Sequence, residues 1–134
     1  MKPAILMMFR DEADILGKCL EHWYSLGVRN FYLCDNGSKD QSVDVVWKFK
    51  TVLKFSDPDS FIYLGFEYAT DWPGRRVINS LKEMAINDGC DWLFPADADE
   101  FLELPPWHTL ESWIDKYPTI PAWGELPYLN ILPK

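Results

Sequence analysis

Apolar residues fall into short continuous runs that alternate with longer segments of mixed character. Runs of this kind are typical of strands buried on both faces of a sheet. Between them, apolar residues recur every three or four positions, which is the spacing of one helix face. The runs predict strands at 4–9, 31–34, 61–66 and 91–96, and the spaced segments predict helices at 15–24, 41–55, 75–88 and 109–117.

This alternation of strand and helix predicts an α/β fold. Its usual solution is a mostly parallel, Rossmann-like sheet with right-handed crossovers and helices on both faces. After Leu104 the pattern changes, because two prolines interrupt the chain and further prolines follow. We therefore expect a core over residues 1–104, followed over 105–134 by a short helix and a proline-rich tail of irregular or edge structure.

Composition narrows the class of protein. The chain has 134 residues, 48% of them hydrophobic, which suits one compact domain and excludes disorder. The net charge of −8 argues against a nucleic-acid backbone as partner, although it does not exclude a nucleotide. Three cysteines in apolar stretches predict buried free thiols, and no apolar run approaches the ~20 residues of a membrane span. We expect a cytoplasmic protein whose first apolar run is a strand rather than a signal peptide.

Three carboxylates, Asp97, Asp99 and Glu100, follow directly after the predicted strand 91–96. Carboxylates this close together repel one another unless a cation or hydrogen-bond donors compensate their charges. Oxygen ligands suit Mg²⁺ or Mn²⁺. A solvated acidic loop is the plain alternative, since an isolated Asp-x-Asp is a weak motif. An EF-hand is excluded, because Leu102 and His108 would stand where that loop needs Gly and Glu.

Polar clusters follow two other predicted strands, namely 10–12 and 35–38. Successive strands of a parallel sheet end on the same side, so these clusters and Asp97–Asp99 should face one crevice. Taken singly, 35–38 is typical of a turn and 10–12 of a helix start with favourable acids. Because ligand-binding loops are also turns and helix starts, a metal–phosphate site at this edge is the reading we favour.

Three segments, 9–16, 27–40 and 89–102, also carry a family likeness. Phe-Arg-Asp-Glu over 9–12, Asp-Asn-Gly-Ser over 35–38 and Asp-Ala-Asp over 97–99 occur in the order and spacing of a known set. The chain resembles the family 2 type glycosyltransferases of the GT-A fold, many of which have Asn in place of Asp11. The resemblance covers roughly the first hundred residues and is fairly specific as a set.

The resemblance implies a nucleoside-diphosphate sugar of UDP or GDP type as the donor. Asp35, beside Asn36 in the same turn, would accept a hydrogen bond from the base, and Arg10 and Glu12 would lie beside the base and ribose. Asp97 would meet the ribose or a metal-bound water.

The same likeness assigns the metal and a basic contact. Asp99, with Asp97, would hold Mn²⁺ or Mg²⁺ bridging the two phosphates, which assists departure of the nucleoside diphosphate. Arg75 or Arg76, with Asn79 on the helix before the metal strand, would reach the nucleotide; we favour Arg76. Glu100 is either structural or a partner of the metal ligands.

In the resembled family the chain continues beyond the metal strand and there supplies the acceptor site and, in inverting members, a catalytic base. We assign no base, since Glu111 and Asp115 fit a solvated helix face and Glu125 carries no further signal. Trp107, Trp113 and Trp123 either stack on a sugar or simply pack.

Two other functions stay open beside the transferase. The first is a truncated, non-catalytic nucleotide-binding module that acts through a partner or as a homodimer across a free sheet edge. The second is a nucleotidyltransferase, which ranks last because 9–12 contains no glycine. The acceptor and the donor sugar are not specified by the sequence.

Overall fold

The structure of the chain is a computed structural model that describes residues 1–69, 71 and 73–115 and the backbone of 130–132. The elements match the predicted alternation closely. In chain order they are β1 (Pro3–Phe9), α1 (Leu16–Ser25), β2 (Asn30–Asp35), α2 (Ser42–Ser56), β3 (Phe61–Phe66), α3 (Gly74–Asn87), β4 (Trp92–Pro95), β5 (Phe101–Glu103), α4 (Leu110–Ile114) and β6 (Asn130–Leu132).

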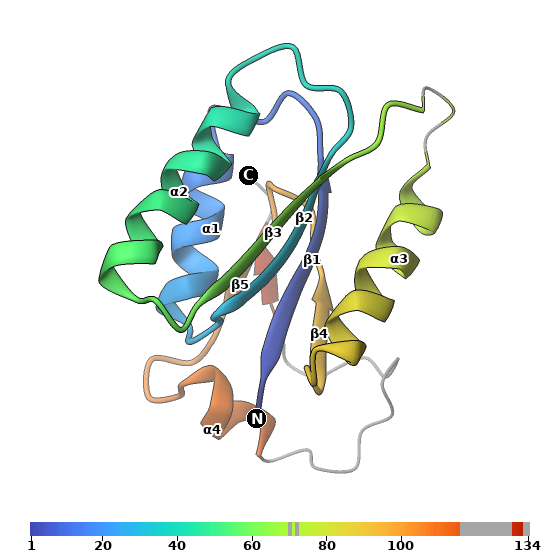
Figure 1. The fold of residues 1–134 in the computed structure, drawn as a ribbon. Helices are drawn as coiled ribbons and strands as arrows, with labels where there is room; N and C mark the ends of the chain where they lie inside the picture. The colour runs from blue at the N-terminus through green and yellow to red at the C-terminus, as the bar shows by residue number, and fades with distance from the viewer. Residues whose placement is uncertain (70, 72, 116–129, 133–134) are drawn as a thin grey trace.

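Within the described residues, four parallel strands form the main sheet in the order β3-β2-β1-β4. Helices α1 and α2 lie on one face and α3 on the other (Figure 1). The predicted α/β architecture, a parallel sheet with helices on both faces, is confirmed. No described helix is both long enough and apolar enough to cross a membrane.

The central strand β1 supplies both halves of the core because its side chains alternate between the two faces. Ile5, Met7 and Phe9 pack under α1 and α2, whereas Ala4 and Leu6 face α3. All five side chains are buried. The continuous apolar run at the start of the sequence is thus explained by burial on both faces.

Strand β4 departs from the expectation of a strand buried on both faces. Trp92, Leu93 and Phe94 are only half-buried. The reason is strand order: among the described strands β4 pairs with β1 alone, so it forms an edge of the sheet. Phe94 is anchored by Trp23 of α1, with ring centroids 5.7 Å apart.

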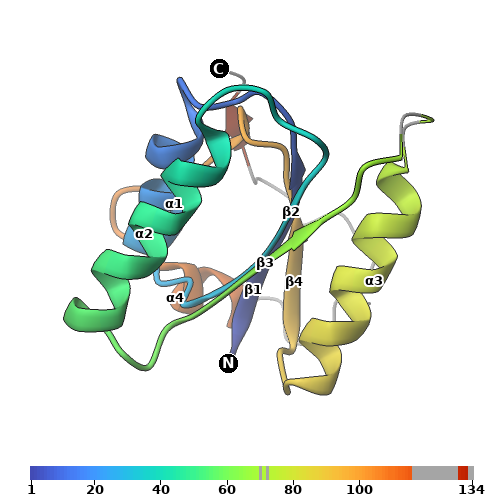
Figure 2. The ribbon, with the colours of Figure 1, turned by 45° about the horizontal axis from the view of Figure 1, so that its top comes forward.

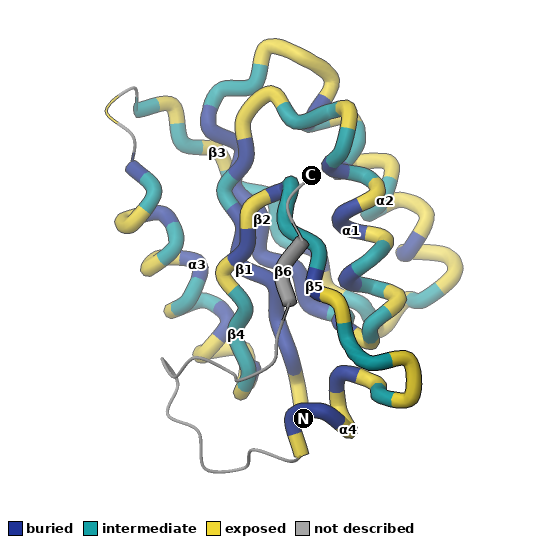
Figure 3. The backbone as a smooth tube through the Cα atoms, turned by 180° about the vertical axis from the view of Figure 1, so that it is seen from behind, coloured by how far each residue is buried: buried dark blue, intermediate teal, exposed yellow. Residues whose placement is uncertain are grey.

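The chain after β4 contains a second, smaller sheet. Strand β5 follows the acidic turn and pairs antiparallel with β6 (Figure 3). Residues 130–132 lie in the tail where irregular or edge structure was expected, and they form an edge strand of this two-stranded sheet. Helix α4 lies inside the predicted 109–117 and begins with a capping box between Thr109 and Ser112. Trp123 and Glu125 lie outside the described residues, and the division at 104/105 stays a prediction.

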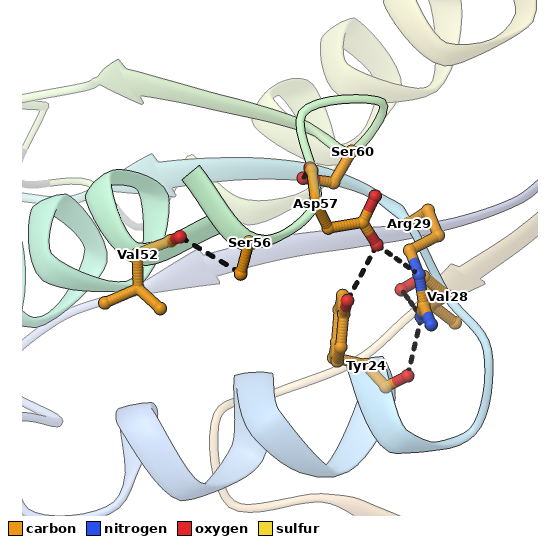
Figure 4. Close-up of polar contacts among 7 residues, drawn as sticks. All are labelled: Tyr24, Val28, Arg29, Val52, Ser56, Asp57 and Ser60. Atoms are coloured by element: carbon orange, nitrogen blue, oxygen red, sulfur yellow. Dashed lines mark hydrogen bonds and ion pairs between the residues drawn. The ribbon is translucent and has the colours of Figure 1, made fainter. Parts of the chain in front are cut away.

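A polar cluster joins the elements at the amino end of the sheet (Figure 4). Arg29 Nε lies 2.9 Å from Asp57 Oδ2, which also accepts a hydrogen bond from the Tyr24 hydroxyl at 2.7 Å. The Arg29 guanidinium lies over the Tyr24 ring, 3.7 Å from its centroid, and donates to the Tyr24 carbonyl at 2.7 Å. This cluster ties the ends of α1 and α2 to the start of β2, far from the carboxyl edge of the sheet.

Candidate functional site

The strand order places a crevice at the carboxyl ends of β1 and β4. The chain leaves β1 toward β2 on one side and reaches β4 on the other, so the connections diverge at this point, where open α/β sheets bind ligands. A cavity of about 640 Å³ lies here. It is lined by the end of β1 and the residues that follow it (8–12), the start of α3 (Gly74, Arg75 and Ile78) and the acidic turn (Asp97, Ala98 and Asp99). Figure 2, with the carboxyl edge brought forward, shows the loops after β1 and β2 side by side.

In the acidic turn, buried alanines alternate with aspartates that line the cavity. Ala96 and Ala98 are 6% and 3% exposed and belong to the core beneath α1 and α2. Asp97 is exposed and Asp99 half-buried, and both line the cavity. Glu100 Oε1 accepts a hydrogen bond from the Asp97 backbone N–H at 2.8 Å. Glu100 therefore stabilises the turn.

Helix α1 holds this turn from behind. The Cys19 thiol donates to the Glu100 carbonyl at 3.5 Å, and His22 Nε2 bonds to the Leu102 carbonyl. Burial, and to a lesser extent the charges of Asp99, Glu100 and Glu12, raise the pKa of the Cys19 thiol to about 12. Cys19 is therefore a structural donor rather than a thiolate ligand at neutral pH.

The donor set fits a hard divalent cation. Asp97 and Asp99 offer oxygen ligands only, as Mg²⁺ and Mn²⁺ prefer. Across the described residues there is no cluster of three His, Cys, Asp or Glu side chains able to enclose an ion. Two carboxylates are nevertheless the usual protein share of a Mg²⁺ site whose other ligands are water and substrate phosphates.

Two of the residues expected beside the nucleotide line this cavity from the loop between β1 and α1, which we call the β1 loop. Arg10 is exposed, Glu12 is half-buried, and both line it. Because the loop follows the central strand, they lie across the crevice from the Asp97–Asp99 turn. The structure thus brings Arg10, Glu12, Asp97 and Asp99 together, as predicted from the order of the strands.

Asp35 and Asn36 have other partners. The Asp35 carboxylate, in a residue that is 3% exposed, accepts from the backbone N–H groups of Gly37 and Ser38 at 3.2–3.3 Å. The Asn36 amide donates to the carbonyls of Glu67 and Ala69 at 2.7 and 3.2 Å. These two residues shape the turn and hold the β3–α3 loop against it, and neither lines the cavity.

The two arginines at the start of α3 point to different places. Arg75 lines the cavity with Gly74 and Ile78. Arg76 Nη1 instead lies 2.6 Å from Glu67 Oε2. Hydrogen bonds from the Ala69 N–H and from Arg76 lower the pKa of Glu67, so this ion pair is formed at neutral pH. The structure therefore brings Arg75, and not Arg76, to the crevice.

Tyr68 is an exposed aromatic residue that no sequence pattern singled out. It is 71% exposed, and its ring stacks on Phe66 with centroids 6.3 Å apart and an interplanar angle of 16°. A Cβ placed on Gly37 would lie 3.9 Å from the Tyr68 ring, so the ring borders the β2 turn. Asn36 fixes the backbone on both sides of it through Glu67 and Ala69.

Trp107 and Trp113, the two described tryptophans that were considered for sugar stacking, do not line the cavity. Trp113 is 5% exposed and sits on α4, beside the start of β1 (Figure 1). Its ring meets that of His108, with centroids 5.2 Å apart, and His108 follows Trp107. This cluster is at the amino end of the sheet, so packing explains Trp113.

Comparisons with known proteins point to one class. No family model matches the chain. The sequence is 25% identical over 123 residues to a glycosyltransferase family 92 protein of Oryza sativa subsp. japonica, covering 91% of this chain. The match covers 20% of the rice protein, so the chain spans about a fifth of that relative's length.

The fold is similar to that of the mannosyltransferase PcManGT from Pyrobaculum calidifontis, solved in complex with GDP-Man and Mn²⁺. The TM-score is 0.62 at 18% identity, over 84% of this chain and 31% of that one. The chain therefore has a GT-A-like glycosyltransferase fold, and its similarity in sequence is also to a glycosyltransferase. Membership of family 2 stays a prediction, since the relative in sequence belongs to family 92.

Proposed function

We propose that this chain forms the donor-binding part of a metal-dependent glycosyltransferase that uses a nucleoside-diphosphate sugar. One observation carries the proposal: Asp97 and Asp99, which alternate with the buried Ala96 and Ala98, line the same cavity as Arg10, Glu12 and Arg75. Oxygen ligands for a hard cation and guanidinium groups for phosphate thus share one crevice at the switch point of the sheet.

Each residue has a distinct proposed role. Asp97 and Asp99 would hold Mn²⁺ or Mg²⁺, and an ion held there would supply positive charge to the diphosphate leaving group. Arg75, which replaces Arg76 in this role, donates to the donor phosphates. Arg10 and Glu12 contact the nucleoside from the β1 loop.

For the base, the proposed contact is the exposed ring of Tyr68 beside Gly37. Tyr68 follows β3 and the acidic turn follows β4, three strand spacings away, or about 14 Å. That separation is comparable with the length of an extended nucleoside diphosphate. Stacking on an aromatic ring suits any base, so this contact does not choose between UDP and GDP donors. Asp35, whose carboxylate is buried, then supports the turn under the base.

The comparisons support the donor class without specifying the donor. The fold neighbour was solved with GDP-Man and Mn²⁺, which makes a guanosine donor worth testing beside a uridine one. Family 2 character and inversion of configuration rest on the resemblance of the three motifs alone. A homodimer remains a prediction, and neither an acceptor nor a base that would activate it is assigned.

The proposal is tested by calorimetric titration of UDP and GDP with and without Mn²⁺. The wild type is compared with Asp99→Asn and with Asp59→Asn, a matched control in the exposed turn between α2 and β3. We expect Mn²⁺-dependent binding of one nucleotide, weakened by at least about tenfold in Asp99→Asn. Asp59→Asn should bind like the wild type.

Two results would contradict this reading. Absence of binding under every condition would remove the donor site from this chain. Binding that is indifferent to Mn²⁺ and to Asp99→Asn would remove the metal role. A second assay, release of nucleotide from UDP- and GDP-sugars, then separates a transferase from a module that binds without turnover.

A further inference from the structure

Asp11 has an unusual backbone conformation at the rim of the crevice. Its φ is +52°, and among the described residues it is the one non-glycine residue with positive φ. Asp and Asn tolerate this left-handed conformation better than other residues with a side chain, and such residues cluster at ligand sites. The conformation persists only where the surroundings determine it.

Three hydrogen bonds to the loop between β2 and α2, which we call the β2 loop, hold Asp11 in this conformation. Asp11 Oδ1 accepts from the backbone N–H groups of Lys39 and Asp40 at 2.6 and 3.2 Å. In return, the Asp11 backbone N–H donates to Ser38 Oγ at 2.9 Å. The partners are 27 to 29 residues apart in sequence, so the contact joins two loops rather than closing one turn.

A second brace joins the same loops. Asp40 Oδ2 accepts from the Ala13 N–H at 3.1 Å, and Asp40 Oδ1 accepts from the Ser42 hydroxyl and N–H at 2.5 and 2.9 Å. The Ser42 hydroxyl, which is fully buried, accepts from the Glu12 N–H at 2.9 Å. The bond from the Ser42 hydroxyl lowers the pKa of Asp40, so the brace keeps its charge at neutral pH.

We infer that Asp11 is a positioning residue, whose Oδ1 fixes the β1 loop so that Arg10 and Glu12 face the donor cavity. Both neighbours line that cavity, and both are attached to the braced backbone. The inference rests on the proposed function for its effect on ligand binding. The brace itself is independent of any ligand.

Substitutions at Asp11 can separate the role of its hydrogen-bonding oxygen from the role of its negative charge. Both bonds to the side chain go to the single atom Oδ1, and the carbonyl oxygen of Asn occupies the same place. Asp11→Asn therefore keeps the bonds and the left-handed backbone but removes the charge. Asp11→Gly keeps the backbone conformation and the backbone N–H bond to Ser38 but loses both bonds to Oδ1. Asp11→Ala also loses both bonds to Oδ1, and its Cβ disfavours the left-handed conformation.

Two measurements are made on these three variants and on Asp59→Asn as control. The first is hydrogen exchange of the Lys39 and Asp40 amides by NMR, with thermal unfolding to verify that each variant is folded. The second is the affinity for the nucleotide that the wild type binds in the presence of Mn²⁺. We expect Asp11→Asn to keep both amides protected and to bind within about threefold of the wild type. Asp11→Gly and Asp11→Ala should lose that protection and bind about tenfold more weakly.

Other outcomes overturn the inference. If Asp11→Asn loses affinity together with Asp11→Ala, the charge acts in the cavity directly. If Asp11→Gly binds like the wild type, backbone conformation suffices without the bonds. If the wild type binds no nucleotide, the proposed function fails while amide exchange still decides the brace: unchanged exchange in Asp11→Gly overturns it, and faster exchange there with protection in Asp11→Asn supports it.

Discussion

The Cys19 thiol of α1 donates a hydrogen bond to the backbone carbonyl of Glu100, 81 residues further along the chain, at 3.5 Å. Through this contact α1, the first helix of the chain, supports the turn that carries Asp97 and Asp99. The support is uncharged at neutral pH, because burial raises the pKa of the thiol from 9.0 to about 12. It therefore adds no ligand charge to the proposed cation site.

Stability should consequently fall at alkaline pH. A group whose pKa is higher in the folded protein contributes stability that is complete below its unfolded pKa and is lost as pH rises through the folded pKa. For Cys19 that window runs from about pH 9 to about pH 12. Urea unfolding at pH 8.5 and 10.5 should show a smaller loss in Cys19→Ser, which keeps a donor but does not titrate there. An equal loss in both proteins would contradict this role.

Arg75 and Arg76 should differ in their effect on the nucleotide. Arg75→Ala removes a guanidinium from the cavity and should weaken nucleotide binding by about tenfold, as expected for a charged hydrogen bond. Arg76→Ala breaks an exposed ion pair with Glu67 and should change the affinity by less than about threefold. Calorimetry on the two variants decides this. The reverse order would restore Arg76 as the nucleotide contact.

Tyr68 should contribute to binding through its ring. Removing a stacking ring costs about 1–3 kcal/mol per base, so Tyr68→Ala should bind the nucleotide roughly tenfold more weakly, and Tyr68→Phe nearly as well as the wild type. Phe55→Ala is the matched control, since Phe55 is 80% exposed on α2 and away from the crevice. If Tyr68→Ala and Phe55→Ala behave alike, the base does not lie on this ring.

Ser42→Ala should destabilise the fold. Ser42 is fully buried, and its loss leaves the Glu12 N–H without the oxygen that it donates to. Because the Glu12 N–H is only partly buried, we expect a loss of about 1 kcal/mol in the free energy of unfolding, measurable by urea denaturation. Ser56→Ala removes an exposed hydroxyl that bonds to the Val52 carbonyl of its own helix, so it should cost less than about 0.5 kcal/mol. Equal effects would show that the loop brace contributes nothing.

Asp57→Asn should separate stability from binding. Asp57 pairs with Arg29 and accepts from Tyr24, whose pKa is raised by that hydrogen bond. Because the cluster is partly exposed, we expect a loss of only about 1–2 kcal/mol in unfolding free energy. Nucleotide affinity should not change, since the cluster lies at the amino end of the sheet. A matched loss of affinity would mean that the two ends are coupled.

The strands and long helices were predictable because their patterns are local. The run 61–66 became β3 with the same bounds, and the three strand–helix repeats determine a parallel sheet. From that sheet it followed that the clusters 10–12, 35–38 and 97–99 would meet at one edge. The first and third line one cavity there, whereas residues 35–38 do not line it. This prediction required no knowledge of side-chain contacts.

Other features depend on contacts that leave no local pattern. Arg75 and Arg76 are adjacent, and only the ion pair with Glu67 decides which of them faces the crevice. The exposure of β4 depends on strand order, and β5 and β6 are three residues each, too short for a period to be detected. Tyr68 is an exposed aromatic residue outside any repeat, so its position beside Gly37 appears only in three dimensions.

The register of β1 with β4 also has a kinetic consequence. β1 pairs with β2 across a short connection. In contrast, β1 meets the β4 segment across a long loop, since the hydrogen-bonded residues Lys2 and Asp91 are 89 positions apart in sequence. Closing the longer loop costs more chain entropy, and pairing over such a distance slows folding. The carboxylates Asp97 and Asp99 follow the strand that closes this loop. We therefore expect the proposed cation site to assemble with the last contacts of the sheet to form, and a ligand that binds there to stabilise that closure.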